Sequence, residues 1–204
     1  MANPVVANIL YGNAVIWKGP VGETVPADSV AHGTAWGGNW VRVGYTTEGV
    51  TATYEDEQTD IGVQEELTAV ERFKSAESLN LETVLAELTS TYLDLAIGAG
   101  TATTTAAAVG QVAKDEYVVG GESILDKAAW GLEGRYVNSS GASFPVRVFI
   151  WKGTAKLNGG LEFAKDKENG TGIPLQINAL ADTSQSAGQR LMKFQRVTAA
   201  ATPA

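Results

Sequence analysis

Strand-like runs separated by turn residues fill the second half of the chain. Apolar and β-branched residues recur in short segments, and clusters rich in Asn, Ser, Gly and Asp divide them. The expected strands span residues 128–137, 144–155, 161–164, 175–181 and 190–197. This half of the sequence therefore predicts a strand-rich body.

The first half adds further expected strands. Residues 14–18 form a short strand pattern closed by Gly-Pro, and the turn-rich segment 26–38 contains the lone His32. Residues 40–45 and 50–54 both alternate between apolar and polar positions, and the four residues between them suit a hairpin connection.

A longer alternating pattern follows over residues 61–74. Its apolar side chains share one parity and its polar side chains share the other, which predicts a long half-exposed strand. Glu65 and Glu71 break this parity, as residues at a bulge or a subunit contact do, although an error in the assigned parity explains them equally well.

One helix is expected in mid-sequence. Asn80 is a suitable N-cap, Glu82 in the first turn complements the helix dipole, and Gly98 suits the C-terminal end. Apolar residues recur between them at three- and four-residue steps, namely Leu81, Val84, Leu85, Leu88, Tyr92 and Leu95. The pattern predicts a helix that begins near Leu81 and ends at Gly98.

The length of 204 residues favours a single domain over residues 1–204, since such a chain buries roughly 70% of its unfolded surface. Residues 1–12 are an expected N-terminal arm, the small-sided segment 99–112 an expected flexible loop, and residues 198–204 an expected loose C-terminus. The first residues lack the basic start and apolar run of a signal peptide, so we expect a soluble chain that is not secreted.

The negative charge is concentrated in one part of the chain. Asp and Glu number 23 against 15 Lys and Arg. Residues 48–87 hold eleven acids and two cations, a net charge of −9, which leaves +1 for the remainder. A protein that binds nucleic acid through phosphates needs a basic patch, so this distribution argues against that function. The simplest interpretation of charge alone is a solvated acidic surface.

The sequence contains few of the residues and motifs that enzymes use for catalysis. There is no Cys, and one His leaves no second imidazole for a metal site or proton relay. Neither a Gly-x-Ser-x-Gly turn nor a P-loop occurs. Paired carboxylates for sugar hydrolysis and an acidic metal site remain weak alternatives. We expect no enzyme activity, no cofactor and no metal.

The five tryptophans allow two interpretations. They can fill the wide space between packed sheets, which is the commoner use of this side chain. Alternatively, exposed indoles form a stacking platform for carbohydrate, in which case the set would comprise Trp17, Trp36, Trp40, Trp130 and Trp151.

Four stretches together resemble a known family. They are Gly49-Val-Thr-Ala-Thr-Tyr-Glu-Asp-Glu-Gln-Thr-Asp60, Val63-Gln-Glu-Glu-Leu-Thr-Ala-Val70, Leu81-Glu-Thr-Val-Leu-Ala-Glu-Leu88 and Gly172-Ile-Pro-Leu-Gln-Ile-Asn-Ala-Leu-Ala-Asp182. With the strand-rich body, single helix and loose termini, the chain resembles the major tail tube protein of long-tailed, siphovirus-type bacteriophages, a relative of the type VI secretion tube protein. The likeness is one of layout and composition.

This resemblance implies a mainly β fold, a two-sheet β-sandwich or partial barrel flanked by one α-helix, with extended arms and loops. It implies that six copies close into a ring whose inner sheets form one barrel, and that rings stack into a tube. Implied partners are identical rings and the tape measure, tail terminator and distal tail proteins. The implied location is the virion tail, after synthesis in the host bacterial cytoplasm, with no membrane association.

A conduit for DNA must not bind its cargo. Carboxylates repel phosphates within a Debye length of about 8 Å, whereas Lys and Arg would bind them. We therefore expect lumen-lining residues on the parity opposite Tyr54, Val63 and Leu67, with Arg72 and Lys74 following on the same face. The candidates are Glu55, Glu57, Gln64, Glu66 and Thr68. A capsid decoration protein, a minor tail protein and a Trp-based carbohydrate-binding module remain alternatives.

Overall fold

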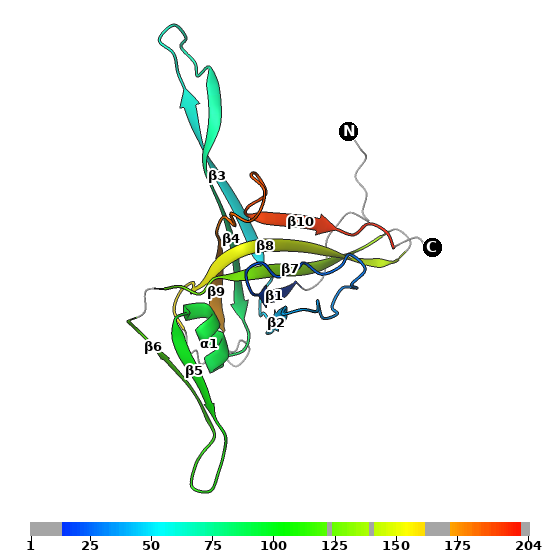
Figure 1. The fold of residues 1–204 in the computed structure, drawn as a ribbon, viewed down its shortest axis with the longest axis vertical. Helices are drawn as coiled ribbons and strands as arrows, with labels where there is room; N and C mark the ends of the chain where they lie inside the picture. The colour runs from blue at the N-terminus through cyan, green and yellow to red at the C-terminus, as the bar shows by residue number, and fades with distance from the viewer. Residues whose placement is uncertain (1–13, 122–123, 139–140, 162–171, 201–204) are drawn as a thin grey trace.

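The computed structural model describes residues 14–121, 124–138, 141–161 and 172–200. In these ranges the chain forms ten β-strands and one helix, so the expected mainly β fold with a single helix is confirmed (Figure 1). The elements are β1 (Val15–Gly19), β2 (Val41–Val43), β3 (Thr51–Ile61), β4 (Glu71–Leu85), α1 (Ser90–Ile97), β5 (Gly100–Thr105), β6 (Lys114–Val119), β7 (Ala128–Val137), β8 (Ser143–Leu157), β9 (Ile173–Ala179) and β10 (Met192–Arg196).

One antiparallel sheet of eight strands contains most of the fold, in the order β2-β1-β7-β8-β9-β4-β3, with β10 also paired to β8. The long strand β8 joins two layers, because residues 143–153 pair with β7 while residues 153–157 pair with β9. The change of partner occurs at Gly153, where an added Cβ would lie 2.9 Å from the carbonyl oxygen of Asn178. A side chain does not fit at this approach of two backbones.

The sheet curves around the main hydrophobic core. Side chains from both layers and from the helix meet there, including Ile16, Leu81, Ala96, Trp130, Ile150 and Leu175. Beyond β2 the chain returns to β4, where Thr46 pairs with Leu85 and the Thr47 N–H donates to the Val84 carbonyl at 3.0 Å. This contact is a single bridge, so the curved sheet does not form a closed barrel. The described residues form two sheets, this one and the separate hairpin β5–β6.

Tryptophans cover the opposite face of β7. Trp17 and Trp36 stack with ring centroids 5.1 Å apart, and Trp36 packs against both Trp40 and Phe149. Trp130 lies in the main core. Four of the five indoles are therefore buried, which is the packing role expected for them and leaves no exposed indole platform for carbohydrate.

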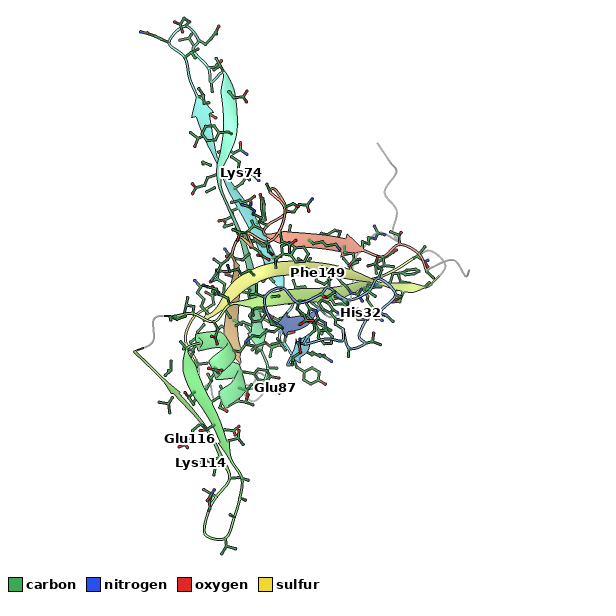
Figure 2. All side chains as sticks on the ribbon, viewed as in Figure 1. His32, Lys74, Glu87, Lys114, Glu116 and Phe149 are labelled. Atoms are coloured by element: carbon green, nitrogen blue, oxygen red, sulfur yellow. The ribbon has the colours of Figure 1, made fainter. Side chains whose placement is uncertain are left out.

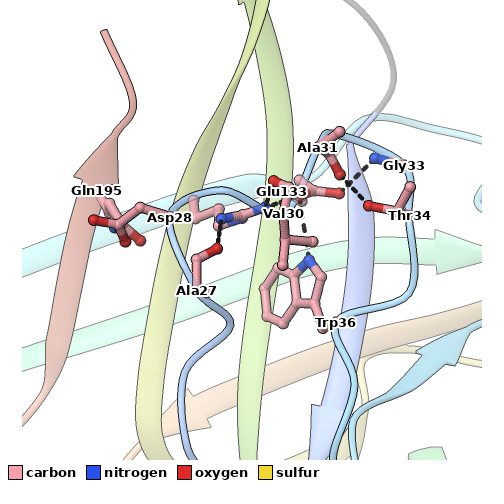
Figure 3. A network of polar contacts seen from close by, with 10 residues as sticks. Ala27, Asp28, Val30, Ala31, Gly33, Thr34, Trp36, Glu133 and Gln195 are labelled. Carbon is pink, nitrogen blue, oxygen red and sulfur yellow. Dashed lines mark hydrogen bonds and ion pairs between the residues drawn. The ribbon is translucent and has the colours of Figure 1, made fainter. Parts of the chain in front are cut away.

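A buried charge pair fixes residues 27–36 over this cluster (Figure 3). Glu133 of β7 and Arg147 of β8 are paired across the strands, have no exposed side-chain area and lie 3.0 Å apart. The Trp36 indole N–H and the Gly33 backbone N–H donate to the Glu133 carboxylate at 3.2 and 2.9 Å. The Arg147 guanidinium also donates to two carbonyls of the segment, those of Ala27 and Val30.

Two hairpins project from opposite ends of this body (Figure 1). The β3–β4 hairpin extends one way and β5–β6 extends the other. Figure 2 shows their side chains directed into solvent, with Lys74 on the first and Lys114 and Glu116 on the second. Every residue of β3 and the first seven residues of β4 are exposed.

The expected helix start at Leu81 is wrong. Residues 81–85 belong to β4, where Leu79, Leu81 and Leu85 point into the core. Residues four apart lie on the same side of a helix and also on the same side of a strand, so this spacing alone does not distinguish the two structures. The helix begins at Ser90, with the Thr89 side chain accepting from the Tyr92 N–H. Its expected end at Gly98 is confirmed.

The expected hairpin of residues 40–54 is also wrong. Strand β2 pairs with β1, and β3 pairs with β4. Between them the backbone N–H groups of Gly44 and Tyr45 donate to Tyr92 and Glu87, which leads the chain past α1 instead of back along β2.

Two further segments differ from expectation. Residues 61–74 do not form one strand: β3 ends at Ile61, a nine-residue connection follows, and β4 starts at Glu71. The segment 99–112, expected to be a loop, contains β5, because its threonines pair with a later β-rich segment, Lys114–Val119. The strands expected at 14–18, 128–137, 144–155, 175–181 and 190–197 are confirmed with small shifts of their ends. The strand expected at 161–164, apart from its first residue, and the arm 1–12 lie outside the described residues.

Candidate functional site

The β3–β4 hairpin separates its charges onto two faces. Residues paired directly across antiparallel strands point to the same side of a sheet. One face contains Tyr54 opposite Leu79 and Asp60 opposite Arg72, and it continues into the core at Leu81. We call this the core-side face. The opposite face contains four acids, which we call the acidic face: Glu55, Glu57, Glu71 and Glu82.

Both cations of the hairpin pair with acids on the core-side face, which also carries Asp56. The Arg72 guanidinium donates to both Asp60 carboxylate oxygens, and this hydrogen bonding lowers the pKa of Asp60 and raises that of Arg72. The Lys74 ammonium donates to the Tyr54 hydroxyl and lies 3.3 Å from the Glu77 carboxylate. The Tyr54 contact is the main cause that raises the pKa of Lys74. Both cations of the segment 48–87 are therefore used on this face.

No cation of the hairpin lies on the acidic face. Along the described part of β3 and β4, Glu55 stands opposite Ser78, Glu57 opposite Ala76, and Glu82 opposite Thr51. None of the three carboxylates forms an ion pair or hydrogen bond with another described residue. At neutral pH this face of the hairpin is therefore a surface of unneutralised negative charge.

The same face continues as a polar surface over the body. Cross-strand pairs carry it from Asn80 to Asn178 and from Glu82 to Gln176 on β9. From there it reaches the end of β8 through Thr154 and Lys156. The other side of these strands carries Leu81, Leu175 and Ile177 into the core. Four strands, namely β3, β4, β9 and the end of β8, thus present a mainly polar surface away from the core. Val84 opposite Pro174 interrupts it, Gln176 is buried, and Lys156 is the only cation among those pairs.

The expected site residues fall into two groups. Glu55 and Glu57 share a face opposite Tyr54, as expected from their parity. Gln64, Glu66 and Thr68 do not share a strand with them but lie in the connection at residues 62–70, which we call the tip. The expectation that Arg72 and Lys74 share the face of Glu55 and Glu57 is wrong, since both pair on the core-side face.

Two acids of this face were missed by the sequence reasoning. Glu82 lies in a segment whose spacing predicts a helix, and Glu71 breaks the parity of the expected strand. The shift of parity has a structural cause: the pairing register changes between Glu57 and Gln58, which leaves Ser75 of β4 unpaired as a bulge. The sequence signal is Gly62, a turn residue at the second position of the expected strand 61–74.

Open backbone edges accompany this surface. Strand β3 is the last strand of the sheet, and β9 pairs with β4 only from Asn80 onwards. The outer part of the hairpin therefore has two unpaired edges and no core of its own among the described residues. A two-stranded hairpin of this kind is marginally stable in water and its edges are templates for another chain.

Other chemistry is sparse in the described residues. They contain no cluster of three His, Asp or Glu side chains suited to a metal ion. No helix in the same ranges has the length and apolar character needed to cross a bilayer. His32 lies in a turn, as expected.

Comparison with known proteins identifies the family. No curated protein matches the chain. A family model described as phage tail tube protein matches residues 1–202, nearly the whole chain. The family is a structural component of the phage virion tail and is not known for enzyme activity. A curved β-sheet with open edges and an acidic surface suits a subunit that assembles with other tail proteins, and the chain belongs to the phage tail tube protein family.

Proposed function

We propose that six copies of this chain close into a ring and that rings stack into a tube through which the phage genome passes. The number six is the one implied by the family resemblance. Pairing of the free β3 edge with a neighbouring copy removes the unpaired backbone groups that a single chain exposes. The open edges of the hairpin support this step.

The acidic face lines the lumen in this proposal. The four strands that carry it also turn apolar side chains into the subunit core, so a barrel built from them presents the polar side inward. Glu55, Glu57 and Glu82 then face the DNA, and repulsion of its phosphates lets the genome pass without specific binding. The observation that carries this assignment is that both cations of the hairpin pair on the core-side face, while Glu55, Glu57 and Glu82 on the acidic face have no cation beside them.

The remaining assembly follows the family resemblance. The tube encloses the tape measure protein and meets the tail terminator and distal tail proteins at its ends, in a siphovirus-type tail. Subunits are made in the host bacterial cytoplasm and assemble there.

Electron microscopy of the purified protein tests ring formation. We expect six-fold rings or tubes; isolated copies or trimers would contradict ring formation.

Glu57 and Asp56, adjacent residues on opposite faces of β3, test the lumen assignment. A Glu57→Lys tube should retain short double-stranded DNA that co-sediments at low salt and resists nuclease, because its lumen binds phosphates. An Asp56→Lys tube has the same change of charge on the core-side face and should protect none. Equal protection by both variants, or protection by Asp56→Lys alone, would show that the lumen assignment is wrong.

A further inference from the structure

A groove runs between β2 and α1 on the body. It has a volume of about 420 Å³. Val41 and Val43 form one wall, Tyr92 and Leu95 of the helix form the other, and Ala128 lies at its base. The Val41 side chain is 66% exposed, although it lies on a strand. The groove thus presents apolar surface to solvent beside a short edge strand.

Cations surround this apolar surface. Lys18, Arg42 and Lys127 line the groove together with a single acid, Asp94. None of the three cations takes part in an ion pair with another described residue. In a protein whose net charge is −8, this local excess of two positive charges favours an occupant that is apolar and acidic.

The tip of the β3–β4 hairpin has the complementary character. Leu67 is fully exposed, and Val63 and Val70 are 41% and 49% exposed. Glu65 and Glu66 lie beside them and form no side-chain hydrogen bond with another described residue. The tip has a defined shape, because the Val70 N–H donates to the Ile61 carbonyl at 2.9 Å and the Glu66 N–H to the Val63 carbonyl at 3.3 Å.

One chain cannot make this contact with itself. The tip lies at the far end of the β3–β4 hairpin, whereas β2 and α1 lie on the other side of the body (Figure 1). We propose that the tip of one copy docks in the groove of a second copy, with Leu67 on the apolar walls and Glu65 and Glu66 beside Arg42 and Lys127. This inference rests on the proposed self-assembly and names one of its contacts.

Cross-linking tests the contact, because the chain has no native Cys. A variant carrying both Leu67→Cys and Val41→Cys, treated with a short bis-maleimide, should give a ladder of covalent multimers on a denaturing gel. Each single-Cys variant can give no species larger than a dimer. The matched control replaces Leu67→Cys by Val109→Cys, an equally exposed residue of the other hairpin, and should give no ladder. A ladder from the control alone, or from neither pair, would overturn the proposal.

Charge reversal tests the complementarity separately. Glu65→Lys with Glu66→Lys, or Arg42→Glu with Lys127→Glu, should each lower the sedimentable fraction at least tenfold, and the four changes together should restore it. The substituted residues are exposed, and circular dichroism verifies folding. If the combined variant assembles no better than either pair alone, the contact is wrong. If the wild-type protein forms no rings or tubes, the proposed function fails. If it forms them but the variant with Leu67→Cys and Val41→Cys gives no ladder, only this inference is refuted.

Discussion

At the scale of single residues, the charges of this chain serve two different purposes. The buried pair Glu133 and Arg147 satisfies the polar groups of a loop and fixes it over the tryptophan cluster. Three exposed acids on the acidic face of the hairpin, Glu55, Glu57 and Glu82, have no such partners. A residue that is buried and fully hydrogen-bonded contributes to the subunit, whereas an unpaired exposed acid contributes to what the subunit repels or binds.

Replacement of one buried partner tests the first purpose. Glu133→Gln leaves the Arg147 guanidinium buried without a counter-charge, and we expect the free energy of unfolding to fall by about 3–5 kcal/mol. Urea unfolding followed by tryptophan fluorescence measures this. Glu116→Gln removes the carboxylate of an exposed ion pair with Lys114 and should cost less than about 1 kcal/mol. Similar costs for both changes would contradict the proposed role of the network.

The pair on the core-side face gives a pH prediction. Hydrogen bonding from Arg72 lowers the pKa of Asp60 below its ordinary value of 3.8. The pair therefore stabilises the hairpin above that ordinary value, and the stabilisation is lost as the pH falls through the lowered pKa. An NMR titration of the Asp60 carboxyl should show its pKa rise towards 3.8 in Arg72→Ala. An unchanged titration midpoint would show that Arg72 does not perturb this carboxyl.

At the scale of elements, β4 and α1 show how one pattern serves two structures. The spacing of Leu81 and Leu85 fits both a strand and a helix. The helix begins only after Thr89, which is its N-cap. The Thr89 side chain accepts from the Tyr92 N–H at 3.3 Å and satisfies one of the free donors of the first turn. The helix consequently contains eight residues and covers one end of the core.

Removal of this cap should weaken the helix. Thr89→Ala leaves the Tyr92 N–H without its acceptor, and we expect a loss of about 1 kcal/mol in the free energy of unfolding. Chemical denaturation measures the change. Thr89→Ser retains an acceptor oxygen and should recover most of the stability; if it does not, the hydrogen bond is not the source of the effect.

Local patterns predict the strands of the second half, because turn residues bound each strand and its apolar side chains contribute to the core. The pairing of β2 with β1 and the tip at residues 62–70 could not be read locally. Both depend on contacts distant in sequence, such as those of Gly44 with Tyr92 and of Asn80 with Asn178. Parity along the chain predicts that Glu55 and Glu57 share a face, as they do on β3, but it places Gln64, Glu66 and Thr68 on an expected strand that the tip interrupts.

At the scale of the whole molecule, much of the described chain lies outside the core. The body is held by the curved sheet and α1, and the two hairpins project from it at opposite ends. A hairpin of two strands rarely has enough apolar contact to remain folded alone. Their length and exposure are therefore features of an assembled subunit, consistent with membership of a tube-forming family.

The two hairpins differ in chemistry as well as direction. The first carries nine of the 23 acids of the chain, whereas the tip of the second, residues 106–113, is uncharged. A stack of identical copies in one orientation along the axis that joins them consequently has polarity: its two terminal surfaces are chemically distinct. A capping protein that recognises one terminus therefore has no matching surface at the other, and growth from a single starting complex has a built-in direction.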